Sequence, residues 1–252
     1  MSGVFLITTT AAIIVKHDGQ AHAEAVGANG AGTRHPRPAP RRPDSKRPER
    51  PAPPKLPYGT PMYYVDDGPK TVALTIDDGP SPVYTPELLR VLSEYRVTAS
   101  FSMVGRNVAA YPEVAREVTA AGHTVVNHTW DHADLASMTV PAVRDEIARA
   151  TDAIHTATGT QPAMFRAPYG AWSPAVYRYC AQTGLTPLDW SVDPRDWARP
   201  GVSKIVKTVL DTTRTGSIIL EHDGGGNRSQ TVAALKIWLP RLLDAGYHFT
   251  TP

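Results

Sequence analysis

Residues 72–80 read Val-Ala-Leu-Thr-Ile-Asp-Asp-Gly-Pro. A short run rich in apolar and β-branched side chains, followed by a turn signal, is typical of a buried strand. The pattern predicts a strand over 72–76 with Asp77 and Asp78 at its C-terminal end, where α/β barrels carry their chemistry. Asp-Asp-Gly-Pro also occurs at 66–69, and there we expect only a tight turn.

Beyond this stretch the chain alternates between strand-like and helix-like patterns. The predicted strands cover 72–76, 98–104, 124–127, 186–189, 217–220 and 247–250, and the predicted helices cover 86–95, 108–121, 140–158, 202–210 and 232–245. Such alternation implies an α/β protein with a parallel sheet. The number of repeats favours a barrel-like closure of that sheet over an open one.

The first 61 residues differ in composition from the rest. An apolar run over 4–15 precedes Ala21-His22-Ala23, which fits a signal-peptidase site, although no Lys or Arg precedes the run. We therefore expect residues 1–23 to be a signal peptide, with no stable membrane span because spanning needs about 20 residues. Residues 24–61 carry eight basic and three acidic side chains among many prolines, which predicts a basic Pro/Arg-rich linker. Adhesion of this linker to anionic wall polymers is the alternative.

Composition excludes several classes of protein. Apolar residues make up 41% and charged residues 20% of the 252-residue chain, which fits a globular body rather than disorder or a polytopic membrane protein. Residues 62–252 hold 17 basic and 20 acidic side chains, so we expect no nucleic-acid partner. Cys180 is the only cysteine, which rules out an intrachain disulfide, and its apolar surroundings predict a buried helical position.

Two enzyme classes lack their sequence signature. No Gly-x-Ser-x-Gly elbow occurs, which disfavours a serine hydrolase of the α/β type. The glycines at 224–226 are not followed by the Lys-Ser or Lys-Thr of a phosphate-binding loop, which disfavours a nucleotide enzyme.

Histidines and carboxylates recur after predicted strands. His128 and His132 are four residues apart and can share a metal if the segment turns helically, although this spacing alone is weak evidence. With Asp78 the set becomes two imidazoles and one carboxylate, which leaves positions open for water and substrate. Three more clusters follow predicted strands or loops, and each taken alone has a structural explanation: Arg166-Ala167-Pro168-Tyr169-Gly170, Asp193-Pro194-Arg195-Asp196-Trp197 and Ile219-Leu220-Glu221-His222-Asp223.

Five motifs therefore occur in order along the chain: Thr75-Ile76-Asp77-Asp78-Gly79-Pro80, His128-Thr129-x-x-His132, Arg166-x-Pro168-Tyr169, Asp193-x-x-Asp196-Trp197 and Leu220-x-His222. Together they resemble the motifs of the polysaccharide deacetylases, carbohydrate esterase family 4, over about residues 70–252. The resemblance implies a distorted, incomplete (β/α) barrel with about seven parallel strands. It also implies that residues 62–252 form the catalytic domain.

The resemblance assigns chemistry to the matching residues. It implies a divalent metal, zinc first and cobalt as the alternative, bound by Asp78, His128 and His132. It implies Asp77 as the general base and His222 as the general acid that protonates the leaving amine.

The resemblance also assigns supporting roles. Arg166 would pair with Asp77, Asp196 would orient His222, and the backbone N–H of Tyr169 would stabilise the oxyanion. The predicted substrate-binding residues are Pro168, Trp197 and Leu220.

The implied reaction is hydrolytic removal of acetyl groups from N-acetylglucosamine-containing polysaccharide, peptidoglycan or chitin oligomers, with release of acetate. Two alternatives stay open: O-deacetylation of acetylated xylan by the same metal centre, and a non-catalytic wall-binding module. We expect a monomer that is secreted or associated with the cell wall, with a polysaccharide as its partner.

Overall fold

The computed structural model describes residues 59–252, and its first strand is β1 (Thr71–Gly79). The predicted signal peptide and nearly all of the predicted linker lie outside the described residues. Every residue of β1 is buried except Asp78, which is half-buried. A strand buried on both faces is typical of a parallel sheet covered by helices.

Strands and helices alternate along the rest of the described chain. The other strands are β2 (Ser100–Met103), β3 (Thr124–Asn127), β4 (Met164–Phe165), β5 (Thr186–Pro187), β6 (Ile218–His222) and β7 (His248–Thr250). The helices are α1 (Tyr84–Tyr95), α2 (Gly105–Ala110), α3 (Pro112–Ala120), α4 (Val140–Thr158), α5 (Pro174–Thr183), α6 (Val202–Thr212) and α7 (Ser229–Asp244). Three 3₁₀ turns complete the order: η1 (Leu135–Ser137), η2 (Pro168–Gly170) and η3 (Asp196–Ala198).

The seven strands of the described chain pair in parallel. Their order is β5-β4-β3-β2-β1-β6, and β7 pairs with the first residues of β1. The chain that follows β5 reaches the opposite edge of the sheet, where Val192 bridges to Ile219 and the N–H of Leu220 donates to the carbonyl of Val192 at 2.9 Å. The sheet is therefore a curled, incomplete barrel, which confirms the predicted fold class.

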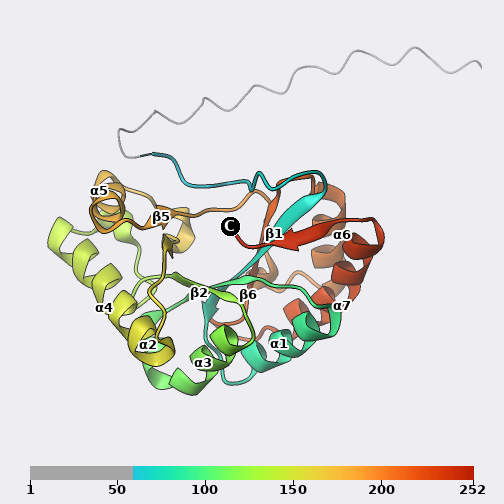
Figure 1. Ribbon diagram of the computed structural model, residues 1–252, viewed down its shortest axis with the longest axis horizontal. Coiled ribbons are helices and arrows are strands. Elements are labelled where there is room, and N and C mark those ends of the chain that lie inside the picture. Colours follow the sequence, from blue (N-terminus) through green and yellow to red (C-terminus); the bar gives the residue numbers. More distant parts are fainter. Residues whose placement is uncertain (1–58) are drawn as a thin grey trace, which may run out of the picture. The chain divides into compact units, whose positions relative to one another are not determined.

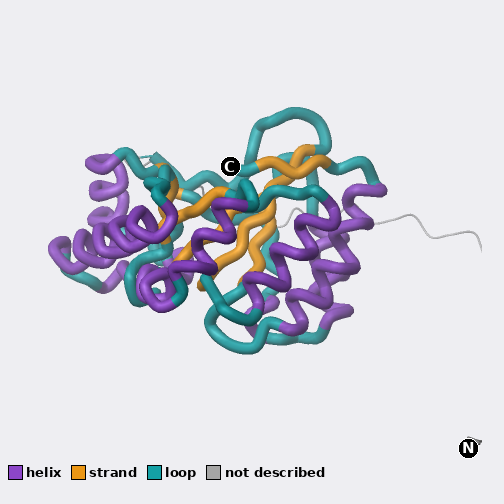
Figure 2. Tube along the Cα trace, turned by 60° about the horizontal axis from the view of Figure 1, so that its bottom comes forward, coloured by secondary structure: helices purple, strands orange, loops and turns teal. Residues whose placement is uncertain are grey.

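The helices cover the outside of the curled sheet, as Figures 1 and 2 show. Because the strands are parallel, their C-terminal ends meet at one edge of the sheet, and the loops that leave this edge are brought together. Within residues 59–252, no helix has both the length and the apolar character required to cross a membrane.

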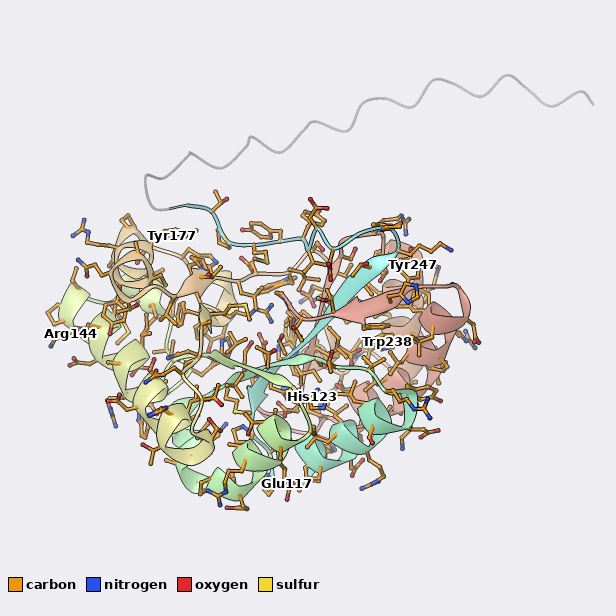
Figure 3. All side chains as sticks on the ribbon, in the orientation of Figure 1. Glu117, His123, Arg144, Tyr177, Trp238 and Tyr247 are labelled. Carbon is orange, nitrogen blue, oxygen red and sulfur yellow. The ribbon has the colours of Figure 1, made fainter. Side chains whose placement is uncertain are left out.

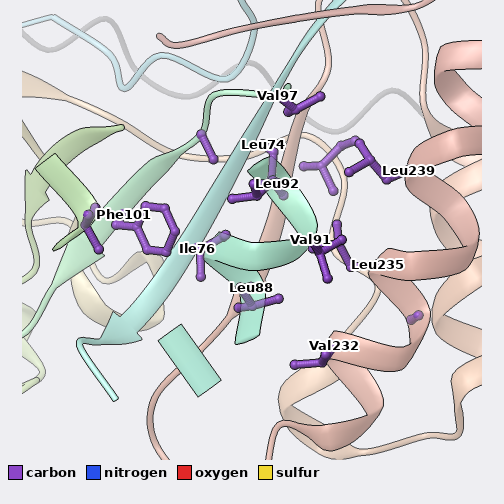
Figure 4. Packing of buried hydrophobic residues seen from close by; sticks show 14 of the residues in the cluster. Leu74, Ile76, Leu88, Val91, Leu92, Val97, Phe101, Val232, Leu235 and Leu239 are labelled. Carbon is purple, nitrogen blue, oxygen red and sulfur yellow. The ribbon is translucent and has the colours of Figure 1, made fainter. Parts of the chain in front are cut away.

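The main core lies between the sheet and helices α1 and α7. Leu88, Val91 and Leu92 form the buried stripe of α1 and pack between β1 and α7, as Figure 4 shows. Burying each such side chain contributes about 1.5–3 kcal/mol. Trp238 of α7, labelled in Figure 3, is fully buried, and its indole N–H donates to Oε1 of the buried Glu221 at 2.8 Å.

Local sequence signals explain several helix ends. Pro112 occupies the first turn of α3, where its missing N–H costs nothing. The hydroxyl of Ser173 accepts the N–H of Val176 and caps α5. Helices α4 and α5 end at Gly159 and Gly184, whose φ angles of 73° and 74° are left-handed.

Apart from shifts of a few residues at the ends of several elements, the structure differs from the prediction in three places. The predicted helix 108–121 is two helices, α2 and α3, because Tyr111 leaves helical geometry before Pro112. Strand β4 was not predicted, since two residues carry no periodicity. Helix α5 was expected only around Cys180, which is indeed buried in it, and burial raises the pKa of that thiol to about 12.

Candidate metal centre and active site

A β-bulge at the end of β1 separates two adjacent carboxylates. Asp77 pairs with Ser102 and Gly79 pairs with Met103, so Asp78 is the extra residue in the strand. Its φ angle of 75° lies in the left-handed region that non-glycine residues rarely adopt. A bulge redirects a side chain out of the strand's regular alternation, and Asp77 and Asp78 therefore meet different partners.

Asp77 forms an ion pair with Arg166, which follows β4 and is fully buried. Nη1 of Arg166 donates to Oδ1 of Asp77 at 2.7 Å and to the hydroxyl of Thr75 at 2.8 Å. Nη2 donates to the backbone carbonyl of Asp189 at 2.9 Å. These bonds occupy Oδ1 of Asp77 and leave Oδ2, which lies 3.8 Å from Nε2 of His128.

Asp78, His128 and His132 converge on one position. Oδ1 of Asp78 lies 3.1 Å from Nε2 of His132 and 3.5 Å from Nε2 of His128, and the three ligand atoms all lie within 4.8 Å of one another. A tetrahedral zinc site with bonds of about 2.0–2.2 Å separates neighbouring ligand atoms by about 3.4 Å. In the described part of the chain, Oδ1 of Asp78 is buried without a hydrogen-bond partner, a need that a cation satisfies. The three residues fit a divalent metal.

The second nitrogen of each imidazole is held by another group. Nδ1 of His128 lies 2.9 Å from the carbonyl of Arg166, and Nδ1 of His132 lies 3.1 Å from the hydroxyl of Tyr169. The rings of His132 and Tyr169 also meet edge to face, with centroids 4.7 Å apart. A proton on each Nδ1 leaves the lone pair of Nε2 directed at the metal position.

The charges of this centre favour metal binding. Burial alone would raise the pKa of Asp78, but the imidazoles of His128 and His132 and the charge of His222 outweigh it and hold that pKa well below its usual range. Asp78 is therefore a carboxylate, the form that binds a metal.

The two histidines come together through an irregular loop, although their spacing indicated a shared metal only for a segment that turns helically. Thr129 and His132 both adopt left-handed backbone, with φ angles of 66° and 61°. Each such residue costs about 1–3 kcal/mol and persists only where the surrounding structure enforces it. Spacing alone could not predict this conformation.

A second pair of polar groups lies at the end of β6. Nδ1 of His222 is 2.7 Å from Oδ1 of Asp196, while Oδ2 of Asp196 accepts the backbone N–H of His222 at 2.9 Å and the hydroxyl of Thr231 at 2.7 Å. Burial disfavours the charged imidazole, but Asp196, with further help from Asp78 and Asp77, raises the pKa of His222 to about 9. His222 is therefore protonated at neutral pH.

Both groups of residues open onto one cleft of about 500 Å³ at the C-terminal edge of the sheet. Two aromatic side chains lie on this cleft and are largely exposed, Tyr169 at 69% and Trp197 at 44%. Leu220 adds a buried apolar surface beside them. The cleft therefore combines polar groups that can act on a bond with flat surfaces that suit a sugar ring.

The structure brings most of the predicted site residues to this cleft. Asp77, Asp78, His128, His132, Tyr169, Trp197, Leu220 and His222 line it. Arg166 and Asp196 lie behind the lining and hold Asp77 and His222. Pro168 is buried in η2 and is absent from the lining residues of the described chain.

Among the lining residues that were not predicted as site residues are two with large side chains, Trp190 and Arg228. The Trp190 ring lies 5.7 Å from the guanidinium carbon of Arg166, and its position directly after the predicted strand 186–189 was the available signal. Arg228 is 5% exposed and donates to the carbonyls of Gly224 and Trp197 at 2.6 and 3.2 Å. Single arginines in loops are common, so no sequence pattern singles out Arg228.

Close approach between the end of β1 and the loop after β6 explains the glycines that flank the site. A Cβ atom on Gly224 would lie 1.9 Å from the carbonyl oxygen of Asp78, and one on Gly79 would lie 2.4 Å from Oδ1 of Asp223. Both distances are too short for any side chain. Glycine at these positions lets the loop after β6 pass directly against the end of β1.

The fold and the site together define a class of protein: an incomplete (β/α) barrel with a candidate two-histidine, one-carboxylate metal centre at the C-terminal edge of its strands. Residues 64–188 match the family model described as polysaccharide deacetylase. The chain belongs to the polysaccharide deacetylase family.

Three relatives illustrate the range of this family. A chitooligosaccharide deacetylase of Bradyrhizobium sp. is 44% identical over 71% of this chain and 88% of its own length. The crystal structure of the peptidoglycan N-acetylglucosamine deacetylase Bc1960 has a TM-score of 0.73 at 30% identity, covering 75% of this chain and 89% of that one. BA3943 of Bacillus anthracis, described as a pseudoenzyme of the CE4 family, has a TM-score of 0.71 at 26% identity, covering 76% and 67%.

Proposed function

We propose that this chain is a metal-dependent hydrolase that removes acetyl groups from N-acetylglucosamine residues of peptidoglycan or chitin oligomers and releases acetate. The proposal rests on one observation: the adjacent carboxylates of Asp77 and Asp78 have different partners. Asp77 is paired with Arg166 and keeps one oxygen free, whereas Asp78 lies with two imidazoles at a candidate metal position.

The metal position supplies the first requirement for cleaving an amide. Asp78, His128 and His132 would hold a divalent cation, zinc or cobalt, which polarises a carbonyl and makes water more acidic when bound. The protein's own contribution is to orient both imidazoles before the cation binds, through the contacts at their Nδ1 atoms.

Asp77 is suited to be the general base. Its Oδ1 is held by Arg166, and its Oδ2 is directed toward the candidate metal position, 3.8 Å from Nε2 of His128. A water molecule at the mouth of the centre would lie within reach of Oδ2 and pass its proton there as it attacks the acetyl carbon.

His222 is suited to be the general acid. Asp196 occupies Nδ1 of His222, so the proton available for transfer is the one on Nε2. Because Asp196 also raises the pKa of His222 to about 9, that proton is present at neutral pH and can pass to the leaving amine. The backbone N–H of Tyr169, in η2, would stabilise the oxyanion that forms in between.

The cleft walls are suited to a polysaccharide. The exposed rings of Tyr169 and Trp197 offer flat apolar faces for sugar rings, and Leu220 offers an apolar contact for the acetyl methyl group. The relatives named for chitooligosaccharides and for peptidoglycan support an N-acetylglucosamine polymer as the substrate class.

The two alternatives, a wall-binding module and a xylan O-deacetylase, predict different experimental results. A non-catalytic wall-binding module has no need of a general base and a general acid in addition to a metal site, and this chain has residues suited to all three roles. Removal of O-acetyl groups from xylan would use the same groups, so substrates must be compared directly. We further propose that the protein is a monomer that acts outside the cell or at the cell wall.

Acetate release from peptidoglycan, chitooligosaccharides and acetylated xylan, measured side by side, tests the proposal. We expect release from the first two, loss of release with a chelator, and recovery when zinc or cobalt is added. Acetate release from acetylated xylan alone would favour O-deacetylation as the reaction. Saturable binding to all wall polymers without acetate release at any metal concentration would favour the binding module.

A further inference from the structure

The loop that carries both histidines is held from outside by helix α4. Glu146, a half-buried residue of α4, places Oε2 at 3.0 Å from the backbone nitrogen of Trp130 and at 3.0 Å from that of Asp131. Both N–H groups belong to the segment between His128 and His132. Two successive N–H groups directed at one oxygen form a small anion-binding concavity, and here a carboxylate of the same chain fills it.

Other contacts hold further backbone groups of this segment. The N–H of Thr129 donates to Oδ1 of Asn127 at 2.9 Å, and Nδ2 of Asn127 donates to the carbonyl of Ile147 in α4 at 2.8 Å. At the start of α2, the N–H groups of Gly105 and Arg106 donate to the carbonyls of Thr129 and Trp130 at 2.9 and 3.0 Å. The segment is therefore held by both α2 and α4.

This support matters because the segment has an unfavourable backbone. Thr129 and His132 are both left-handed, and such residues persist only where neighbouring contacts enforce them. Without Glu146, the N–H groups of Trp130 and Asp131 would lose their charged acceptor. The loop would then relax toward ordinary backbone angles and move the imidazoles away from Asp78.

We infer that Glu146 is a positioning residue for the metal centre: it holds the loop between His128 and His132 in the conformation that brings both Nε2 atoms to Asp78. This inference rests on the proposed function only in taking these three residues as the metal ligands. Glu146 touches neither metal nor substrate, and its effect passes through the backbone of Trp130 and Asp131.

The test is the affinity of the metal-free full chain for Zn²⁺, measured by competition with a chromogenic chelator. Loss of an outer partner of a metal ligand typically weakens metal binding by about 10–100-fold, and we expect this for Glu146→Ala. Glu146→Gln keeps an acceptor oxygen on an arm of the same length and should stay within about threefold of wild type. The absorption spectrum of bound Co²⁺ should change in the alanine variant and not in the glutamine variant.

Asp145→Ala is the matched control, because Asp145 precedes Glu146 in α4, is exposed and pairs with Arg144. An alanine variant of Glu146 that binds Zn²⁺ within twofold of this control would overturn the inference while leaving the proposed function intact. If Glu146→Ala does not fold, Glu146→Asp decides: its shorter arm should weaken binding, and unchanged affinity would overturn the inference. Wild-type protein that binds no Zn²⁺ would overturn both the metal centre and this inference.

Discussion

Oδ1 of Asp77 accepts a 2.7 Å hydrogen bond from Nη1 of Arg166, and both side chains are buried. The pair explains how two consecutive aspartates serve different purposes. Arg166 lies behind the lining of the cleft and fixes Asp77, while the bulge at Asp78 turns the next carboxylate toward the histidines.

Replacing Asp77 by Asn should remove the base and leave the metal ligands in place. We expect kcat/KM for N-acetylglucosamine oligomers to fall by about 10²–10⁴-fold, since general-base catalysis contributes that much, with an unchanged Zn²⁺ dissociation constant. Asp66→Asn is a matched control from the exposed Asp-Asp-Gly-Pro copy at 66–69. Full activity in Asp77→Asn would contradict the base assignment.

Replacing Arg166 by Met should destabilise the fold because it leaves the Asp77 carboxylate buried and unpaired. Removing one partner of a buried pair costs about 3–5 kcal/mol, which urea unfolding can measure. The double variant Arg166→Met with Asp77→Asn should recover part of this loss but no activity. An unfolding free energy within about 1 kcal/mol of wild type in the single variant would show that the pair is not held as the structure places it.

The pH dependence of activity should reflect the titration of the His222 imidazole. Its pKa of about 9 means that the acid is charged below that pH, so activity should fall as the pH rises through about 9. Asp196→Asn removes the main group that raises the pKa, and burial then favours the neutral ring. The alkaline limb should therefore move to lower pH in this variant.

The raised pKa of His222 also predicts how the stability of the fold changes with pH. The folded pKa of His222 lies above its ordinary value of 6.5, so this group stabilises the fold fully below pH 6.5 and loses that contribution as the pH rises through about 9. Unfolding measured from pH 6 to 10 should show this loss in wild type and a smaller one in Asp196→Asn. Asp211→Asn, which changes an exposed carboxylate of α6, should follow wild type.

Replacing Gly224 by Ala should disturb the centre through packing alone. The added Cβ would meet the carbonyl oxygen of Asp78 at 1.9 Å, so the end of β1 or the loop after β6 must move. Overpacking of this kind costs about 1–3 kcal/mol, and we expect Zn²⁺ affinity to fall with it. Gly226→Ala adds a Cβ with nothing within 4 Å but at a φ of 138°, so it introduces backbone strain without steric overlap and should lower metal affinity less than Gly224→Ala does. Equal affinities in the two variants would refute the steric explanation.

The sequence allowed the prediction of the elements whose signals are local. Strand β3 was predicted at its observed bounds because its apolar run lies between turn residues, and α4 because its apolar period ends at Gly159. Local patterns placed polar residues after predicted parallel strands, whose C-terminal ends meet at one edge. The resemblance of the ordered motifs to the polysaccharide deacetylases then indicated which of these residues are candidate ligands and proton-transfer groups.

The remaining features depend on contacts between distant parts of the chain. The bulge at Asp78 arises from its pairing with β2, and the left-handed loop between the histidines is imposed by α2 and α4. Thr231 reaches Asp196 from the start of α7, and Arg228 reaches the cleft across a glycine loop. None of these relationships has a periodicity or spacing that a single sequence displays.

The most direct test of the metal centre is anomalous diffraction at the zinc edge from crystals of the full chain grown with Zn²⁺. We predict one strong peak about 2.0–2.2 Å from Oδ1 of Asp78 and from Nε2 of both His128 and His132, with Oδ2 of Asp77 outside bonding distance. A peak bound by other residues, or imidazoles turned away from Asp78 in the presence of zinc, would contradict it.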